Sequence, residues 1–419
     1  MESLRFLKSS EAHSLRAAHG SPLYVYDARS IRCQAESILA FGAPYGLTVR
    51  FAMKACPSGA ILRLLESLGL HFDASSIWEA RRAMLNGIAP GKISISTQEL
   101  PADFADLITK GVTLNACSLR QLEAYGKAFP GAYVGVRLNP GLGSGHTGKT
   151  NTGGPASSFG IWHEYLPQVK EIAARYGLKI YRAHSHVGSG GDPAIWEKVA
   201  IMNLDVVRQL PDVNVLNLGG GFKVARVPGE KSADIAAIGA RVGQAIRKFA
   251  EETGRELFLE LEPGTFIMAN CGALLTTVQD CVDTGASGFN FLKLDAGMTE
   301  ILRPSLYGSQ HALVVVPQEP TEKTGDYVVV GHCCESGDLI SCAPGEPETL
   351  APRTLTHATP GDILVIEGAG AYCSGMPAKN YNSFPEIAEV LKEESGAFTL
   401  IRKKQTLEQV VQNEILPGF

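Results

Sequence analysis

The chain has 419 residues, of which 45% are hydrophobic and 19% charged, and its formal net charge is -5. A chain of this length can bury a large core, with room for one large domain and at least one smaller one. The slight acidic balance argues against a nucleic-acid-binding protein, which needs a concentrated basic surface, and no apolar run approaches the roughly 20 residues of a membrane span.

The first residues, MESLRFLKSSEAHSLRAAHG, form a mixed polar segment without the apolar core of a secretory signal. Nine cysteines, an odd number, are scattered along the chain without CxxC or Cys/His metal spacing. This usage predicts free thiols in a reducing cytoplasm and no metal site.

One pattern recurs from residue 48 onward, in which a short apolar or β-branched run is followed by a helix-like segment. The first five runs start roughly 20–23 residues apart, the length of one strand–helix unit. The eight runs are TVRFAMK (48–54), HFDASS (71–76), KISIST (92–97), VTLNACS (112–118), YVGVRL (133–138), IYRAHSHVG (180–188), VLNLGGG (215–221) and LFLELEPG (257–264).

The segments between these runs carry helix signals. The helix after the first run has regularly spaced leucines and is predicted to end at Gly69, a favourable C-terminal residue. Ser76 with Glu79, and Ser118 with Gln121, have the spacing of capping boxes directly after strands.

Eight strand–helix units predict an α/β fold, a TIM-type (β/α)8 barrel over residues 26–275. An open doubly wound sheet is the alternative, but it is less favoured because polar and glycine-rich residues follow strand ends all along the series rather than at one switch point.

From residue 276 to 419 the chain changes to strands separated by turn-rich segments. This pattern predicts a mainly β second domain, to which residues 1–25 would add a strand or a helix. The strand-like runs are LLTTVQDCV (274–282), which begins at the boundary, FLKLDAG (291–297), HALVVV (311–316), DYVVVGHC (326–333) and DILVIEGAG (362–370).

In a (β/α)8 barrel the active site lies at the C-terminal mouth, so residues that close the strands are the candidates. Each has an ordinary structural explanation, since a strand-end His is commonly bound locally, a Gly triplet is commonly a turn and a buried Glu is commonly an ion-pair partner. The set that the pattern brings together is Lys54, Asp73, Arg137, Asn139, His186, Ser189, Gly219, Gly220, Gly221 and Glu262.

Taken together, these residues match the needs of pyridoxal phosphate. The aldehyde of this cofactor needs a lysine amino group, for which Lys54 is the candidate. Its phosphate needs backbone N–H groups at close range, as in a Gly-rich turn. Its pyridine nitrogen needs a carboxylate, here Glu262, and the flat ring of His186 can lie against it.

The segments FAMKAC, HSHVGSG, NLGGGF and ELEPG resemble the alanine-racemase-like fold of pyridoxal phosphate enzymes, in its decarboxylase branch. Four more segments are similar to the diaminopimelate decarboxylase family, so that the resemblance covers nearly the whole chain. They are NPGLGSGHTGKTNTGG (139–154), RPSLYGS (303–309), GHCCESGD (331–338) and GAGAYCSGMPAKNYNSFP (368–385).

The resemblance implies decarboxylation of meso-2,6-diaminopimelate to L-lysine with pyridoxal 5'-phosphate. Lys54 would hold the cofactor covalently, His186 would stack on its ring and Glu262 would pair with its pyridine nitrogen. Asp73 and Arg137 are further candidates for cofactor binding. The phosphate would be held by Ser189, Gly219, Gly220, Gly221 and Tyr372.

The resemblance also assigns residues to the substrate. Arg303 and Tyr307 would bind the distal carboxylate and Glu335 the distal amino group, and Tyr372 is a further candidate for substrate binding. Cys334 would be the acid that returns a proton after CO2 leaves. In this family the Cys and Glu segment crosses a dimer interface, so the resemblance implies a homodimer with shared active sites and no nucleic-acid or membrane partner.

Two positions depart from the family pattern. Thr265 stands where the family has an arginine after Glu-Pro-Gly, and Ser158 stands where relatives commonly have a lysine. A threonine donates one neutral hydrogen bond where an arginine donates a charge-assisted pair, so phosphate affinity or substrate choice could differ.

Three alternatives remain open at this point. The first is a related decarboxylase acting on another amino acid or on a carrier-linked one, as Thr265 suggests. The second is a racemase, but racemases of this fold pair the pyridine nitrogen with arginine rather than with a carboxylate such as Glu262. The third is a cofactor carrier or pseudo-enzyme, which would lack the β domain, the lysine or the acid.

Overall fold

The computed structural model describes residues 2–142, 153–186 and 190–418. The chain divides into two compact units. The barrel unit comprises Arg32–Val224 and Lys231–Ile267, and the β unit comprises Met1–Ile31, Ala225–Glu230 and Met268–Phe419.

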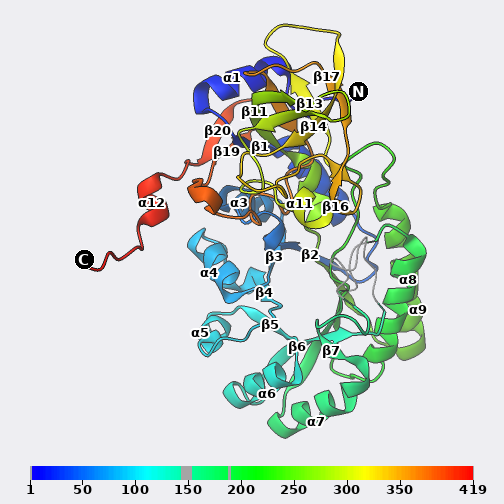
Figure 1. Cartoon of the computed structure of the whole chain (residues 1–419). Coiled ribbons are helices and arrows are strands. Elements are labelled where there is room, and N and C mark those ends of the chain that lie inside the picture. Colours follow the sequence, from blue (N-terminus) through cyan, green and yellow to red (C-terminus); the bar gives the residue numbers. More distant parts are fainter. Residues whose placement is uncertain (1, 143–152, 187–189, 419) are drawn as a thin grey trace. The chain divides into compact units, whose positions relative to one another are not determined.

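Eight parallel strands close into a ring in the barrel unit (Figure 1). They are β2 (Leu47–Ala52), β3 (His71–Ala74), β4 (Ile93–Ile95), β5 (Thr113–Ala116), β6 (Tyr133–Asn139), β8 (Lys179–His184), β9 (Val215–Asn217) and β10 (Phe258–Leu261). The order around the ring is β5-β4-β3-β2-β10-β9-β8-β6, and β5 pairs with β6 to close it. Each strand coincides with one of the eight predicted runs, so the predicted TIM-type fold is confirmed.

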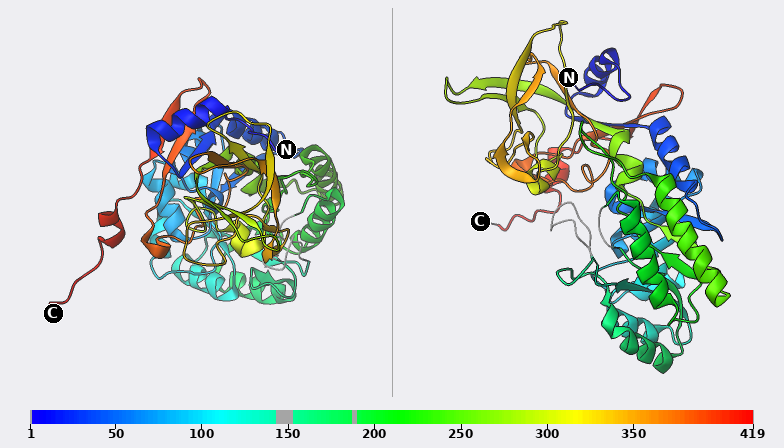
Figure 2. Two further views of the ribbon diagram at one scale, coloured as in Figure 1. Left: turned by 45° about the horizontal axis from the view of Figure 1, so that its top comes forward. Right: turned by 90° about the vertical axis from the view of Figure 1, so that its right-hand side faces the viewer.

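Helices follow the strands, as expected for strand–helix units. They are α3 (Gly59–Ser67), α4 (Ile77–Leu85), α5 (Phe104–Thr109), α6 (Leu119–Ala128), α7 (Leu166–Tyr176), α8 (Pro193–Val207), α9 (Ile235–Thr253) and α10 (Thr265–Met268), and a further helix, α2 (Ala28–Leu39), precedes β2. The helices α8 and α9 pack side by side (Figure 2). Short additions are β7 (Ile161–Trp162), which pairs with β6, and the 3-10 turns η1 (Met53–Ala55), η2 (Pro90–Lys92) and η4 (His163–Tyr165).

The helix ends mostly follow the sequence signals. After α3, Gly69 has φ +92°, and the N–H groups of Gly69 and Leu70 donate to the carbonyls of Glu66 and Leu65 at 2.9 and 3.1 Å. This is the Schellman arrangement that a C-terminal glycine favours, so the prediction at Gly69 is confirmed.

The two capping boxes are only half as predicted. Ser76 accepts the N–H of Glu79 at 3.1 Å, but the Glu79 carboxylate accepts the N–H of Ser75 at 2.6 Å rather than that of Ser76 itself. The start of α6 repeats the variant, since the side chain of Gln121 accepts the N–H of Cys117 at 2.8 Å. In both helices the Glu or Gln side chain thus binds the N–H of the residue before the N-cap.

The β unit contains a mixed sheet in which the N-terminal strand is central. Its strands are β1 (Leu23–Asp27), β11 (Gly272–Asp283), β12 (Asn290–Leu294), β13 (Leu313–Val316), β14 (Thr324–Val330), β17 (Arg353–Thr356), β18 (Ile363–Ile366), β19 (Ala388–Lys392) and β20 (Phe398–Arg402). β1 pairs antiparallel with β11 and parallel with β19. The smaller elements are β15 (Cys342–Ala343), β16 (Glu346–Leu350), α11 (Arg303–Tyr307), α12 (Leu407–Val411), η5 (Ala269–Cys271) and η6 (Tyr381–Ser383).

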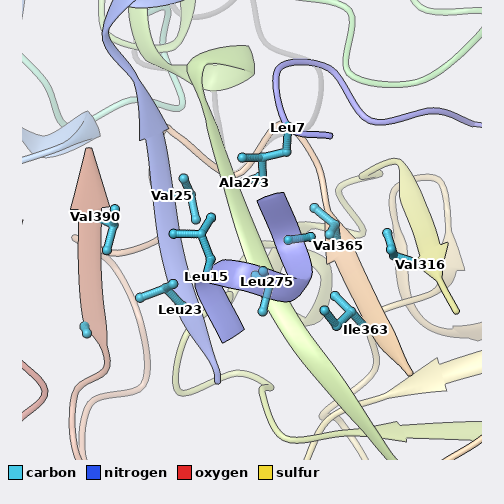
Figure 3. Packing of buried hydrophobic residues seen from close by; sticks show 12 residues of the cluster. Leu7, Leu15, Leu23, Val25, Ala273, Leu275, Val316, Ile363, Val365 and Val390 are labelled. Carbon is cyan, nitrogen blue, oxygen red and sulfur yellow. The ribbon is translucent and has the colours of Figure 1, made fainter. Parts of the chain in front are cut away.

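The helix α1 (Ser9–His19) packs on this sheet through an apolar cluster (Figure 3). Leu15 from the helix lies among side chains of β1, β11 and β18, such as Val25, Leu275 and Val365. All four side chains are at most 3% exposed. Apolar burial of this kind stabilises the fold by about 1.5–3 kcal/mol per large side chain.

Among the described residues, none of the helices has the length and apolar character that a membrane span needs.

We expect Leu15→Ala to destabilise the β unit by about 2–5 kcal/mol, because it removes apolar surface and leaves a cavity in the cluster. Hydrogen exchange of amides in β1 and β11 measures this locally, whereas tryptophan fluorescence reports only the barrel unit, where all three tryptophans lie. Leu400→Ala is the matched control, since Leu400 is 42% exposed in the same unit. Equal protection losses in the two variants would contradict this assignment.

Candidate active site

Lys54 lies at the barrel mouth, but not within the strand that was predicted to end at it. The strand β2 ends at Ala52, and Lys54 is the middle residue of the 3-10 turn η1. Its side chain is exposed, while Met53 and Ala55 on either side are buried. The turn thus anchors the backbone and presents one ammonium group at the mouth.

Glu262 is the first residue after β10 and is held from two sides. Its Oε1 accepts the side-chain N–H of Asn217 at 2.7 Å, and its Oε2 lies 3.1 Å from Nε2 of His184. Burial opposes ionisation of this carboxyl, but the contacts with His184 and then the hydrogen bond from Asn217 outweigh it and hold the pKa of Glu262 well below the usual range. Glu262 is therefore a carboxylate inside the barrel.

The same chain of contacts continues deeper into the barrel. Glu260, two residues earlier on β10, pairs with Arg50 at 2.8 Å and with Arg182 at 3.0 Å. Burial of Glu260 is offset by these two guanidinium groups, which lower its pKa. The side-chain amide of Asn217 donates to both carboxylates, to Glu260 at 3.1 Å and to Glu262 at 2.7 Å. Asn217 thus couples the buried ion pairs to the mouth.

His186, two residues after the end of β8, is a neutral imidazole. Burial, followed by the cationic groups of Lys54 and Arg137, lowers its pKa well below the ordinary value. The backbone N–H of Gly220 donates to its Nδ1 at 3.1 Å. An accepting Nδ1 carries no proton, so the ring keeps its proton on Nε2.

The glycines after β9 allow a close approach of backbones. A Cβ at Gly220 would lie 2.0 Å from the carbonyl oxygen of Glu262, so no other residue fits there. Gly219 has φ +67°, and its N–H donates to Oδ1 of Asn217 at 2.8 Å. The N–H groups of Gly219 and Gly220 are thus already engaged, which the sequence pattern did not indicate.

The mouth also contains buried polar atoms without hydrogen-bond partners among the described residues. Asp73 Oδ1 on β3 and Ser185 Oγ after β8 are two of them. Burial and then repulsion from Glu262 raise the pKa of Asp73 well above its usual value. Buried polar atoms are nearly always satisfied in native proteins, so such atoms indicate where a ligand binds.

Arg137 and Asn139 lie on β6, as predicted. Arg137 is 8% exposed, and its guanidinium carbon lies 5.1 Å from the centre of the Phe159 ring. Asn139 accepts the N–H of Gly154 at 2.9 Å and donates to its carbonyl at 3.0 Å, so it has a structural role. Ser189, which was predicted to bind the phosphate, lies outside the described residues.

The helix α11 of the β unit brings Arg303 and Tyr307 together. The Arg303 guanidinium carbon lies 5.7 Å from the centre of the Tyr307 ring, and its Nη2 donates to Oγ of Ser309 at 3.3 Å. Tyr372, in the same unit, has φ +58°, a left-handed conformation that is costly for a tyrosine. Such strain persists where the surrounding structure fixes it, often at a functional site.

The two adjacent cysteines have different surroundings. Cys333 is half-buried, its N–H donates to Oδ2 of Asp338 at 2.8 Å, and burial followed by the charge of Asp338 raises its pKa to about 12. Cys334 is exposed, and its N–H donates to Oδ1 of Asn382 at 2.9 Å. Glu335 is exposed as well. The turn therefore presents the predicted pair, Cys334 and Glu335, at the surface of the β unit.

Sequence reasoning did not identify the residues that hold Glu262. They are His184, Asn217, Glu260, Arg50 and Arg182. A signal was present, because the polar residues in RAH (182–184) and ELE (260–262) alternate with apolar ones. Alternation with period two places such residues on one face of a strand, here inside the ring.

The comparisons with known proteins agree with this geometry. Residues 31–269 match the family described as pyridoxal-dependent decarboxylase, pyridoxal binding domain. The diaminopimelate decarboxylase of Streptomyces coelicolor is 36% identical over 96% of this chain and 91% of its own length. The enzyme of that name from Escherichia coli K12 is 35% identical, with 96% of both chains covered.

Solved structures extend the likeness to three dimensions. A crystal structure of a diaminopimelate decarboxylase, 34% identical, superposes with a TM-score of 0.90 over 97% of this chain and 96% of that chain. The Helicobacter pylori enzyme of that name, solved with L-lysine, is 27% identical with a TM-score of 0.85 and covers 96% of this chain and 98% of that chain. By sequence and by fold, the chain belongs to the diaminopimelate decarboxylase family of pyridoxal-dependent decarboxylases.

Proposed function

We propose that this protein decarboxylates meso-2,6-diaminopimelate to L-lysine and CO2 with pyridoxal 5'-phosphate. The observation that carries the proposal is the match over nearly the full length to relatives named for this reaction. A cytoplasmic location is part of the proposal, and its support is that all nine cysteines are free thiols.

The residues at the barrel mouth fit the proposed cofactor. Lys54 offers an exposed amino group for covalent attachment, and the neutral ring of His186 can lie flat against a pyridine ring. Asp73 and Ser185 supply buried polar atoms that lack partners in the described structure. The phosphate would lie by Ser189, Tyr372 and the Gly219–Gly221 turn. Because the N–H groups of Gly219 and Gly220 already donate to Asn217 and His186, the contacts to the phosphate would come from Ser189, Gly221 and Tyr372.

Glu262 has the charge that decarboxylation requires. Pyridoxal phosphate, when bound, supplies a protonated pyridine ring that takes up the electron pair left by the departing CO2. The carboxylate of Glu262 would stabilise that proton, and Asn217 and His184 hold the carboxylate in place. A racemase of this fold would have an arginine at this position, so Glu262 favours decarboxylation.

The β unit would recognise the end of the substrate that does not react. Arg303 can bind a carboxylate through two parallel N–H groups, and Tyr307 and Tyr372 can add hydroxyl contacts. Glu335 would take the distal ammonium group. A diamine-forming decarboxylase acting on lysine or ornithine has no distal carboxylate to bind, so an arginine there would repel its substrate's ammonium group.

Cys334 would return the proton that replaces CO2. A thiol group can serve as a general acid when it is placed beside the reacting carbon. The neighbouring Cys333 is a poor donor, since its pKa is raised to about 12. We also propose a homodimer whose active sites combine residues of both chains, on the basis of the family resemblance.

The proposal is tested with purified, cofactor-loaded protein and a panel of amino acids, by following CO2 release. Activity on meso-diaminopimelate and little on lysine, ornithine or arginine is expected. Thr265 favours one alternative, a related decarboxylase with another or a carrier-linked amino-acid substrate. Release of CO2 from a different member of the panel, with none from diaminopimelate, would support that alternative.

Lys54 is expected to carry the cofactor, because it presents the ammonium group at the mouth. Borohydride reduction of the loaded protein followed by peptide mass spectrometry should place the pyridoxyl group on Lys54. Lys223→Ala is a control on another lysine of the barrel unit and should leave the labelling unchanged. Label on any other lysine would refute the assignment.

Cys334→Ala is expected to keep the visible absorbance of the bound cofactor and to lose most turnover, roughly 10²–10⁴-fold for a lost general acid. Cys333→Ala is the matched control and should keep turnover, because the raised pKa of Cys333 makes it a poor donor. Normal turnover in Cys334→Ala with loss in Cys333→Ala would reverse the two roles.

Shared sites predict complementation between inactive variants. Mixing Lys54→Ala and Cys334→Ala chains should form heterodimers with one intact site and restore up to about half of the activity per mixed dimer, given two equivalent sites in a symmetric dimer. Subunit exchange is verified by mass spectrometry of tagged chains. Exchange without recovery would mean that each site is built within one chain.

A further inference from the structure

The β unit holds a buried arginine to which the proposed function gives no role. Arg226 lies in the segment Ala225–Glu230, which belongs to the β unit although barrel residues precede and follow it in the chain. Its side chain is only 8% exposed. Its Nε donates to the carbonyl of Gly368 at 3.1 Å, whereas its Nη2 is buried and has no hydrogen-bond partner among the described residues.

Several contacts fix the position of Arg226. Its N–H donates to Oε2 of Glu230 at 2.7 Å, and its carbonyl accepts from Nη2 of Arg5 at 2.6 Å. Gly368 makes room for the side chain, since a Cβ there would lie 3.2 Å from Cγ of Arg226. These two hydrogen bonds fix the backbone of Arg226, and the hydrogen bond from its Nε to the Gly368 carbonyl fixes the guanidinium group.

A second guanidinium lies within electrostatic reach. Burial and then repulsion from Arg303 lower the pKa of Arg226 to about 9, so the group stays charged at neutral pH. Arg303 also has a buried Nε without a hydrogen-bond partner in the described part of the chain. Over the same residues neither arginine forms an ion pair with a carboxylate. An anion that binds both groups would relieve their repulsion and satisfy both N–H donors.

The reaction defines which anion fits. When one carboxylate of diaminopimelate leaves as CO2, the carboxylate at the other end remains and becomes the only carboxylate of lysine. Its two oxygens can accept about four hydrogen bonds and can therefore serve two guanidinium groups at once. Thr265, which stands where relatives have an arginine, offers a single neutral hydroxyl instead.

We propose that Arg226 acts with Arg303 to bind the carboxylate that the substrate retains, and so determines specificity for it. This inference rests on the proposed decarboxylase function. Arg226 would then supply the second positive charge that the family pattern places at the position of Thr265. There are two competing outcomes. Arg226 would have a purely structural role, or it would bind the phosphate of the cofactor.

Product binding to the cofactor-loaded protein separates these outcomes. L-lysine carries the retained carboxylate, and 1,5-diaminopentane has the same two amino groups without it. We expect Arg226→Gln to weaken L-lysine binding roughly 10- to 100-fold, as for a lost charge-assisted contact, and to leave diaminopentane binding unchanged. Gln can still donate to the Gly368 carbonyl, so the local fold is retained.

Two further variants sharpen the comparison. Arg226→Lys keeps the charge without the planar fork and should bind L-lysine with intermediate affinity. Arg353→Gln is the matched control, because Arg353 lies in the same unit but already pairs with Glu2 at 2.7 Å. It should bind L-lysine like the wild type.

Three results would overturn the inference. Unchanged L-lysine binding in Arg226→Gln would make Arg226 structural. A weakened affinity for pyridoxal phosphate, with L-lysine binding otherwise intact, would assign Arg226 to the phosphate. Equal losses for L-lysine and diaminopentane would indicate general damage to the site.

Failure of the proposed function is recognised separately, as wild-type protein that neither decarboxylates diaminopimelate nor binds L-lysine. The carboxylate site is then tested by thermal unfolding, in which the Tm in succinate is compared with the Tm in chloride at equal ionic strength. A succinate-induced rise in Tm that Arg226→Gln abolishes and Arg353→Gln keeps would retain the anion site with another substrate. No difference between wild type and Arg226→Gln would remove the site as well.

Discussion

The hydrogen-bonded chain that ends at Glu262 is the constraint on which the candidate site depends. A carboxylate inside a barrel is costly unless it is paired, and this one is held by Asn217 and His184. Asn217 also bridges to Glu260, which pairs with Arg50 and Arg182. The buried charges therefore pair with one another, and the Glu262 carboxylate at the mouth is held in position by residues of the barrel interior.

This support explains how two nearby carboxyl groups acquire opposite properties. Glu262 has cationic and hydrogen-bonding neighbours that lower its pKa, whereas Asp73 is buried with an unpartnered oxygen and faces the charge of Glu262, which raises its pKa. Environments that shift the pKa values of two titratable groups in opposite directions are typical of catalytic sites. His186 is kept neutral by burial and by the charges of Lys54 and Arg137, which lower its pKa.

Much of this arrangement could be predicted from the sequence, because local signals agree with the fold. The eight runs were found from apolar patterning and spacing, and the candidates for the mouth from their place at strand ends. The supports of Glu262 were missed, since a pairing such as Asn217 with Glu260 depends on which strands are neighbours. Arg226 was missed for a related reason, because no local pattern shows that Ala225–Glu230 belongs to the β unit.

The role of Glu262 is tested most directly by Glu262→Gln, which keeps the shape and the donors around it but removes the charge. The account predicts that the variant still binds pyridoxal phosphate on Lys54 with its visible absorbance, while CO2 release from meso-diaminopimelate falls by roughly 10²–10³-fold, as for a lost electrostatic contact to the reacting group. Unchanged CO2 release by Glu262→Gln would contradict the account, because the buried charge would then have no part in the reaction.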